Sequence, residues 1–100
     1  MKLNAVVIFG TLLLTSGPAV LSAQDAAALY RTKCAACHGA SGEGKAVMKA
    51  PALKGTQLDA GQIMAQLTKG DPAKKAPHNK AITGLKPDQA KALAEYVKSL

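Results

Sequence analysis

The part of this 100-residue chain that most constrains its fold is the run Cys34-Ala35-Ala36-Cys37-His38. Two thiols three positions apart, with an imidazole directly after the second, lie on about one turn of helix at roughly 3.6 residues per turn. On one turn, both sulfurs and the ring can meet the same flat porphyrin. We therefore predict one covalently bound haem c, attached through thioether bonds to Cys34 and Cys37, with His38 as the proximal iron ligand.

Three other uses of these residues stay open from the sequence alone. A zinc site needs four ligands and would have to add His78, although the adjacent Cys37 and His38 fit a tetrahedron poorly. A thioredoxin-like redox pair begins a helix in a βαβ unit, and nothing around Cys34 resembles a strand. A disulfide between Cys34 and Cys37 would close a very small loop and stabilise the fold little.

The N-terminal residues have the pattern of a secretory signal peptide. Lys2 precedes an apolar segment at residues 5–14, and the small-residue ending at residues 21–23 suits signal peptidase. The apolar segment is shorter than the about 20 residues that span a bilayer, so a retained membrane anchor is the less favoured interpretation. We expect a signal peptide at residues 1–23, a mature domain at residues 24–100, and export to the periplasm.

A mature domain of this size buries only a marginal core without help from a cofactor, a metal or disulfides. Its aromatic residues are Tyr30 and Tyr96, because Phe9 lies in the expected signal peptide and the chain has no Trp. Large flat side chains normally carry much of the buried area of a core. Their scarcity is what we expect if a haem provides that area instead.

The chain is basic, with 13 Lys and Arg against 6 Asp and Glu and a net charge of +7. No basic run is interleaved with aromatic residues, so the sequence does not indicate nucleic-acid binding. A diffuse positive surface is suited to an acidic protein partner or to an anionic membrane.

Three stretches have the apolar spacing of helices, at residues 25–33, 59–69 and 87–100. No stretch has a convincing strand pattern. Asp25 complements the start of the first helix, and Gly70 is placed to end the second. Pro87 is a favoured first residue for the third, whose apolar residues recur at helical spacing. The loops at residues 38–55 and 70–84 are rich in Gly and Pro, and wrapping two faces of a disc-shaped cofactor would explain their length.

These features resemble the small class I c-type cytochromes, the single-haem electron carriers of bacterial periplasms. The resemblance covers essentially all of residues 24–100 and is carried by Leu29-Tyr30, the motif Cys34 to Gly39, Gly42-x-Gly44, Pro51-Ala52-Leu53-x-Gly55 and the closing segment Gly84 to Leu100. It implies an all-α cytochrome c domain with three main helices and long loops wrapped around one covalent haem, the first and last helices crossing. It also implies that the Pro51 carbonyl accepts a hydrogen bond from the second ring nitrogen of His38, which would fix the histidine tautomer.

The sequence departs from that family on the other side of the iron. Many of these cytochromes take their sixth iron ligand from a Met that precedes a Pro before the last helix, whereas here Ala76 precedes Pro77. His78 lies in the same loop and is our candidate distal iron ligand, because iron accepts an imidazole readily. A solvated loop histidine is the other interpretation, and Met64, Met48 or an open iron are the less favoured alternatives.

We expect a monomeric periplasmic electron carrier, not an enzyme, that moves single electrons between larger redox proteins and has no small-molecule substrate. A weak docking face for an acidic partner would consist of lysines in the loops, namely Lys45, Lys49, Lys74, Lys75 and Lys80. The alternative is a haem-based small-ligand sensor or peroxidatic protein with an open sixth coordination position.

Overall fold

The structure is a computed structural model that describes Gly10 and residues 23–100. The expected signal peptide therefore lies almost entirely outside the described residues. The helices are α1 (Ala23–Lys33), α2 (Ala35–His38), the 3-10 helix η1 (Ala46–Met48), α3 (Ala60–Lys69) and α4 (Pro87–Ser99). The described part of the chain contains no strand, only an isolated antiparallel bridge between Lys45 and Ala50. The all-α class is thus confirmed.

The ends of α3 follow from local chemistry. Oδ1 of Asp59 accepts a hydrogen bond from the backbone N–H of Gln62 at 2.7 Å, and Oε1 of Gln62 accepts one from the N–H of Asp59 at 2.9 Å. This reciprocal pair is a capping box, which satisfies two N–H groups that the first helical turn leaves free. At the other end Gly70 has φ +73°. A Cβ there would overlap the backbone of Lys80, so both the conformation and the space require glycine.

The ends of α4 also agree with the expected pattern. Pro87 is in the first turn, where its missing N–H costs no hydrogen bond. Oε1 of Gln89 accepts a hydrogen bond from the N–H of Lys86 at 2.9 Å. Among the residues described, no helix has the length and apolar character needed to cross a membrane.

The core forms where α4 packs against both α1 and α3, which confirms the expected crossing of the first and last main helices. Tyr30 of α1 and Leu93 of α4 are fully buried, and Ile63 of α3 joins the same apolar cluster. The rings of Tyr30 and Tyr96 lie 5.3 Å apart between centroids. These contacts hold α1 and α3 on two sides of α4.

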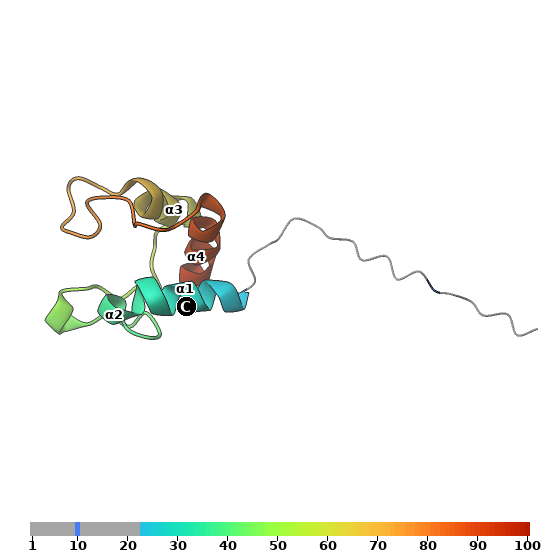
Figure 1. Ribbon diagram of the computed structural model, residues 1–100. Helices are drawn as coiled ribbons and strands as arrows, with labels where there is room; N and C mark the ends of the chain where they lie inside the picture. The colour runs from blue at the N-terminus through green and yellow to red at the C-terminus, as the bar shows by residue number, and fades with distance from the viewer. Residues whose placement is uncertain (1–9, 11–22) are drawn as a thin grey trace, which may run out of the picture.

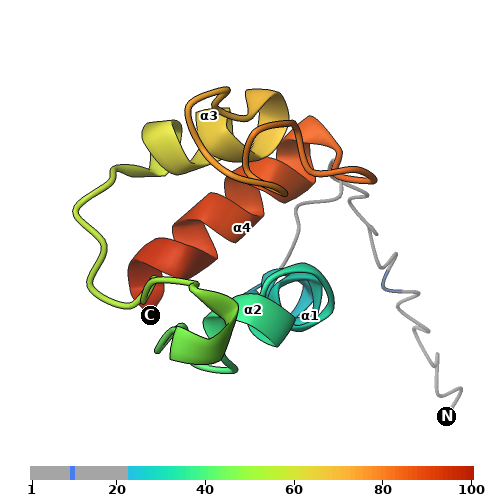
Figure 2. The ribbon, with the colours of Figure 1, turned by 90° about the vertical axis from the view of Figure 1, so that its left-hand side faces the viewer.

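Two sides of the molecule result from this packing. Figure 1 shows α3 and the loop that follows it on one side, α1, α2 and η1 on the other, and α4 joining them. Figure 2 shows the same arrangement turned, with α4 crossing between α3 and the α1–α2 pair.

We call the segment at residues 70–86 the distal loop. The structure contains α2 where the sequence predicts one turn of helix for the cysteine motif, whereas η1 was not predicted, because the sequence pattern indicated only irregular structure after residue 38.

Candidate haem site

The cysteine motif sits at the junction of α1 and α2. Cys34 forms the turn between the two helices, where its N–H donates to the carbonyl of Tyr30 at 2.8 Å and its own carbonyl accepts from the N–H of His38 at 2.9 Å. Cys34 and Cys37 are both half-buried and are not joined by a disulfide bond. Burial raises the pKa of the Cys34 thiol to about 11. The backbone therefore presents two half-buried sulfurs and an imidazole from a single turn.

The ring of His38 is held by the loop that follows η1. His38 is only 7% exposed, and its Nδ1 lies 2.8 Å from the carbonyl oxygen of Pro51. Because a carbonyl oxygen can only accept, Nδ1 carries the proton in this hydrogen bond. The lone pair is then on Nε2, which is the state that a metal-binding imidazole needs.

The other histidine of the chain lies opposite. The ring centroids of His38 and His78 are 5.8 Å apart, with their planes at 47°. Two imidazoles bound to opposite sides of one metal ion have centroids about 6 Å apart, since each metal–nitrogen bond is about 2 Å long. The separation of the two rings therefore fits a single metal ion between them.

His78 differs from His38 in what surrounds its ring. Burial first, and then the neighbouring His38 and Lys74, lower the pKa of His78, which favours the neutral imidazole that binds metals. Its Nδ1 is buried and has no hydrogen-bond partner. Its main chain, in contrast, is well held: the carbonyl oxygen accepts from the N–H of Asp71 at 2.8 Å and from Nε2 of Gln66 at 2.6 Å.

A cavity of about 690 Å³ lies between the two histidines. Its walls include both cysteines of the motif and apolar side chains of α3 and α4, namely Ile63, Leu67, Leu93 and Val97. Cofactor pockets measure about 300–1,000 Å³ and are mostly apolar with a few placed polar groups. Size, lining and donor set together fit a flat apolar macrocycle that reaches both sulfurs.

The donor set fits haem iron better than it fits a free metal ion. Within residues 23–100 and Gly10, no group of three or more His, Cys, Asp or Glu side chains is arranged to hold a metal ion. A zinc site needs four protein or solvent ligands, whereas a porphyrin brings four of the six ligands of its iron and leaves two axial positions. The two facing imidazoles, His38 and His78, are the residues that would hold the iron of a bound haem.

The structure separates the two methionines that the sequence left as alternatives. Met48 lies at the end of η1, is 52% exposed and lines the cavity. Met64 does not line the cavity; it is half-buried and packs against the core cluster from α3. His78, Met48 and Pro51 are therefore brought together with the cysteine motif, and Met64 is not.

Gln66 is a residue of this site that the sequence did not single out. It is half-buried, lies beside the apolar stripe of α3 and lines the cavity together with Ile63 and Leu67. No sequence pattern marks it, because its acceptor, the carbonyl of His78, is twelve positions away. Lys33, Lys49, Lys74 and Lys75 also line the cavity, so four positive charges lie around it.

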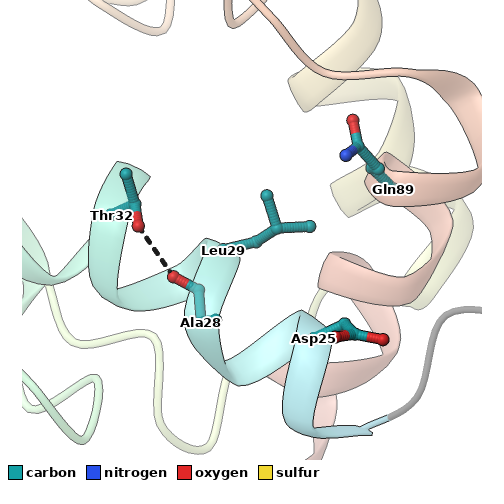
Figure 3. Close-up of a pocket in the computed structure, with 5 residues that line it drawn as sticks. All are labelled: Asp25, Ala28, Leu29, Thr32 and Gln89. Carbon is teal, nitrogen blue, oxygen red and sulfur yellow. Dashed lines mark hydrogen bonds between the residues drawn. The ribbon is translucent and has the colours of Figure 1, made fainter.

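A smaller pocket of about 300 Å³ lies elsewhere, between α1 and the start of α4 (Figure 3). It is lined by Asp25, Ala28, Leu29, Thr32 and Gln89. The hydroxyl of Thr32 donates to the carbonyl of Ala28 within the same helix at 2.9 Å, as Figure 3 shows. The pocket contains no cysteine, histidine or methionine and does not adjoin the haem-sized cavity.

Comparison with known proteins assigns the family. Residues 21–97, more than three quarters of the chain, match the family model described as cytochrome c oxidase, cbb3-type, subunit III. A search of curated proteins finds no match to this chain. The matched region contains the cysteine motif, both histidines, α1, α2, α3 and all of α4 except its last two residues. The chain therefore belongs to the cbb3-type cytochrome c oxidase subunit III family and is a c-type cytochrome domain, which implies haem c binding and electron transfer.

Proposed function

We propose that this protein is a single-electron carrier that holds one haem c through thioether bonds to Cys34 and Cys37, with His38 and His78 as the two axial iron ligands. The observation that carries the proposal is the 5.8 Å separation of the two imidazole rings across a cavity that both cysteines line. Bound haem would provide an iron that gains and loses one electron. The chain contributes the ligands, an apolar enclosure and a surface for partners.

Each histidine has its own role in this proposal. His38 is the proximal ligand, because the Pro51 carbonyl orients its ring and makes Nε2 the free nitrogen. His78 closes the opposite face and leaves no position for a substrate, so the reaction is limited to electron transfer through the haem edge. Replacement of a thioether by a second imidazole also lowers the reduction potential, because a Met ligand favours the reduced iron.

The positive charge near the cavity indicates the kind of partner that this protein would bind. The cavity rim and its neighbourhood carry Lys45, Lys49, Lys74, Lys75 and Lys80, all exposed. We propose that they dock the carrier on acidic faces of larger redox proteins, of which a terminal oxidase is one candidate because the family description names an oxidase subunit. The N-terminal pattern supports cleavage of a signal peptide at residues 1–23 and export to the periplasm, where we propose that the carrier works as a monomer.

The test of this function is the substitution His78→Ala in the haem-loaded protein. Visible and electron paramagnetic resonance spectra of the ferric form are expected to change from low spin to high spin, because one strong ligand is lost. Met64→Leu and Met48→Leu are the controls and keep the low-spin spectra. A His78→Ala variant that stays low-spin would contradict bis-histidine ligation, and loss of the low-spin signal in Met48→Leu would identify Met48 as the ligand.

Covalent attachment is tested separately. Haem stain is expected to remain with the wild-type chain on a denaturing gel, and the Cys34→Ala, Cys37→Ala double variant is expected to lose it. Stain that leaves the wild-type chain would contradict thioether bonding, whatever the axial ligands are.

One observation favours a second function. The buried Nδ1 of His78 has no partner, so the distal ring lacks the hydrogen bond that anchors the proximal one. A ring without that anchor is easier to displace, which would allow a small gas or peroxide to reach the iron as in a sensor or peroxidatic protein. Carbon monoxide separates the two functions: prompt stoichiometric binding to the reduced protein favours the second, and its absence favours the carrier.

A further inference from the structure

Beyond the end of α3, a main-chain hydrogen bond ties the distal loop back to this helix. The N–H of Ile82 donates to the carbonyl of Leu67 at 2.9 Å, which fastens the loop where it leaves the cavity. Inside the loop, the N–H of Asp71 donates to the carbonyl of His78 at 2.8 Å, and the N–H of His78 donates to the carbonyl of Lys75 at 3.0 Å. The two hydrogen bonds that His78 makes with Asp71 and Lys75 join residues of the same loop. They give the loop its shape but do not anchor it to α3.

The side chain of Gln66 connects this part of the loop to the helix. Its Nε2 donates to the carbonyl oxygen of His78 at 2.6 Å, across twelve positions of sequence. Gln66 stands on α3, which packs on α4 in the core. A carbonyl oxygen has two lone pairs, and the N–H of Asp71 and the amide of Gln66 occupy both.

The ring of His78 has no comparable attachment. The Pro51 carbonyl holds Nδ1 of His38, whereas Nδ1 of His78 is buried without a partner. The direction of the distal ring therefore depends on where the main chain of residue 78 is held. The hydrogen bond to the His78 carbonyl therefore orients the ring, as a hydrogen-bond partner of the imidazole itself normally does.

We propose that Gln66 is the positioning residue for the distal ligand: its amide fixes the carbonyl of His78 on α3 and so keeps the imidazole opposite His38. This inference rests on the proposed role of His78 as an iron ligand. It predicts that loss of the Gln66 amide lets His78 leave the iron more often, without changing the proximal ligand.

The experiment measures how fast cyanide binds to the ferric, haem-loaded protein at saturating cyanide, where departure of the distal ligand limits the rate. Gln66→Leu removes the donor, and Gln66→Glu keeps the shape of the side chain but cannot donate when ionised. Both variants are expected to bind cyanide about two- to twelvefold faster than wild type, which is the factor that corresponds to the loss of one net hydrogen bond of about 0.5–1.5 kcal/mol. Gln62→Leu is the matched control, because it also removes a side-chain to backbone hydrogen bond from α3 but at the capping box. Its rate is expected to equal that of wild type within a factor of two.

Each result decides the question. Unchanged rates in both Gln66 variants overturn the proposal, and so does acceleration in only one of them, because packing alone or carboxylate repulsion alone would explain that. Acceleration in Gln62→Leu equal to that in the Gln66 variants also overturns it, since general loosening of α3 would be the cause. If Gln66→Leu does not fold, the Gln66→Glu rate against Gln62→Leu decides.

The His78→Ala spectra keep the two proposals distinguishable. A high-spin His78→Ala protein together with wild-type cyanide rates in the Gln66 variants refutes the positioning role alone. A low-spin His78→Ala protein refutes the ligand role, and the positioning role with it.

Discussion

The imidazole rings of His38 and His78 face each other with 5.8 Å between their centroids, although the two residues lie far apart in the sequence. One belongs to the helical motif that carries the cysteines, and the other to the distal loop beyond α3. What brings them together is α4, because α1 and α3 both pack on it.

The buried hydroxyl of Tyr30 ties α1 to the residue after the proximal histidine. It donates to the carbonyl of Gly39 at 2.7 Å. Tyr30→Phe is expected to lower the free energy of unfolding by about 1–3 kcal/mol, because it leaves a buried carbonyl without its donor. Urea denaturation of the ferric protein at pH 7 measures this. Tyr96→Phe, which keeps the ring contact between the two tyrosines, is the control and is expected to cost less.

The same tyrosine gives a pH dependence. Burial is the first cause that raises the pKa of Tyr30 above its ordinary value of 10.0, so the folded state keeps the proton to higher pH than the unfolded state does. The stabilising contribution is therefore complete below about pH 10 and is lost as the pH rises toward the folded-state value. The difference in unfolding free energy between wild type and Tyr30→Phe should shrink between pH 9 and 11. A difference that stays constant would contradict the raised pKa.

Gly70 sets the start of the distal loop. Gly70→Ala is expected to destabilise the protein and to increase the high-spin fraction, because the new Cβ overlaps the backbone of Lys80 in the same loop as His78. Gly55→Ala is a matched control, since Gly55 also has positive φ, +76°, but has open space where a Cβ would be. Both variants suffer backbone strain of about 1–2 kcal/mol, and Gly70→Ala loses stability beyond that. If urea denaturation gives the same loss of unfolding free energy for Gly70→Ala and Gly55→Ala, the overlap with Lys80 does not destabilise the protein and the prediction is wrong.

Asp59 stabilises α3 from its N-terminus without contact to the cavity. Asp59→Ala removes the side-chain acceptor of the capping box and should lower the unfolding free energy by about 0.5–2 kcal/mol. The ferric spectra are expected to stay low-spin, because the C-terminal part of α3 still carries Gln66 and Leu67. A spectral change as large as that of Gly70→Ala would mean that the whole helix, rather than its C-terminal part, controls the distal side.

The lysines at the cavity are expected to act through charge. Lys74→Glu, Lys75→Glu should slow electron transfer with an acidic redox partner at low salt, and the difference from wild type should fade as the ionic strength rises. Lys54→Glu, Lys91→Glu is the control, because neither residue lines the cavity. Stopped-flow absorbance of the haem at several salt concentrations measures the rates. Identical salt dependence in wild type and both double variants would refute the docking face.

Much of this architecture follows from local sequence patterns. Asp59 and Gly70 delimit α3, and Pro87 begins α4, because caps and prolines act through backbone groups within a few residues. The 3-10 helix η1 escaped prediction, since a single turn has too few residues to show a period. Gln66 also escaped, because its acceptor is the main chain of a residue twelve positions away.

The cysteine motif, the three main helices and the choice of His78 over a missing methionine as the candidate ligand could all be read from the sequence. The family resemblance implied the contact between Pro51 and His38, and the fold forms this contact. That His78 faces His38, and that Met64 packs into the core instead of lining the cavity, follows from the packing of the helices. The reason is physical. Caps, turns and helical periods arise between neighbours in the chain, whereas the separation of two rings depends on how α1, α3 and α4 share one buried core.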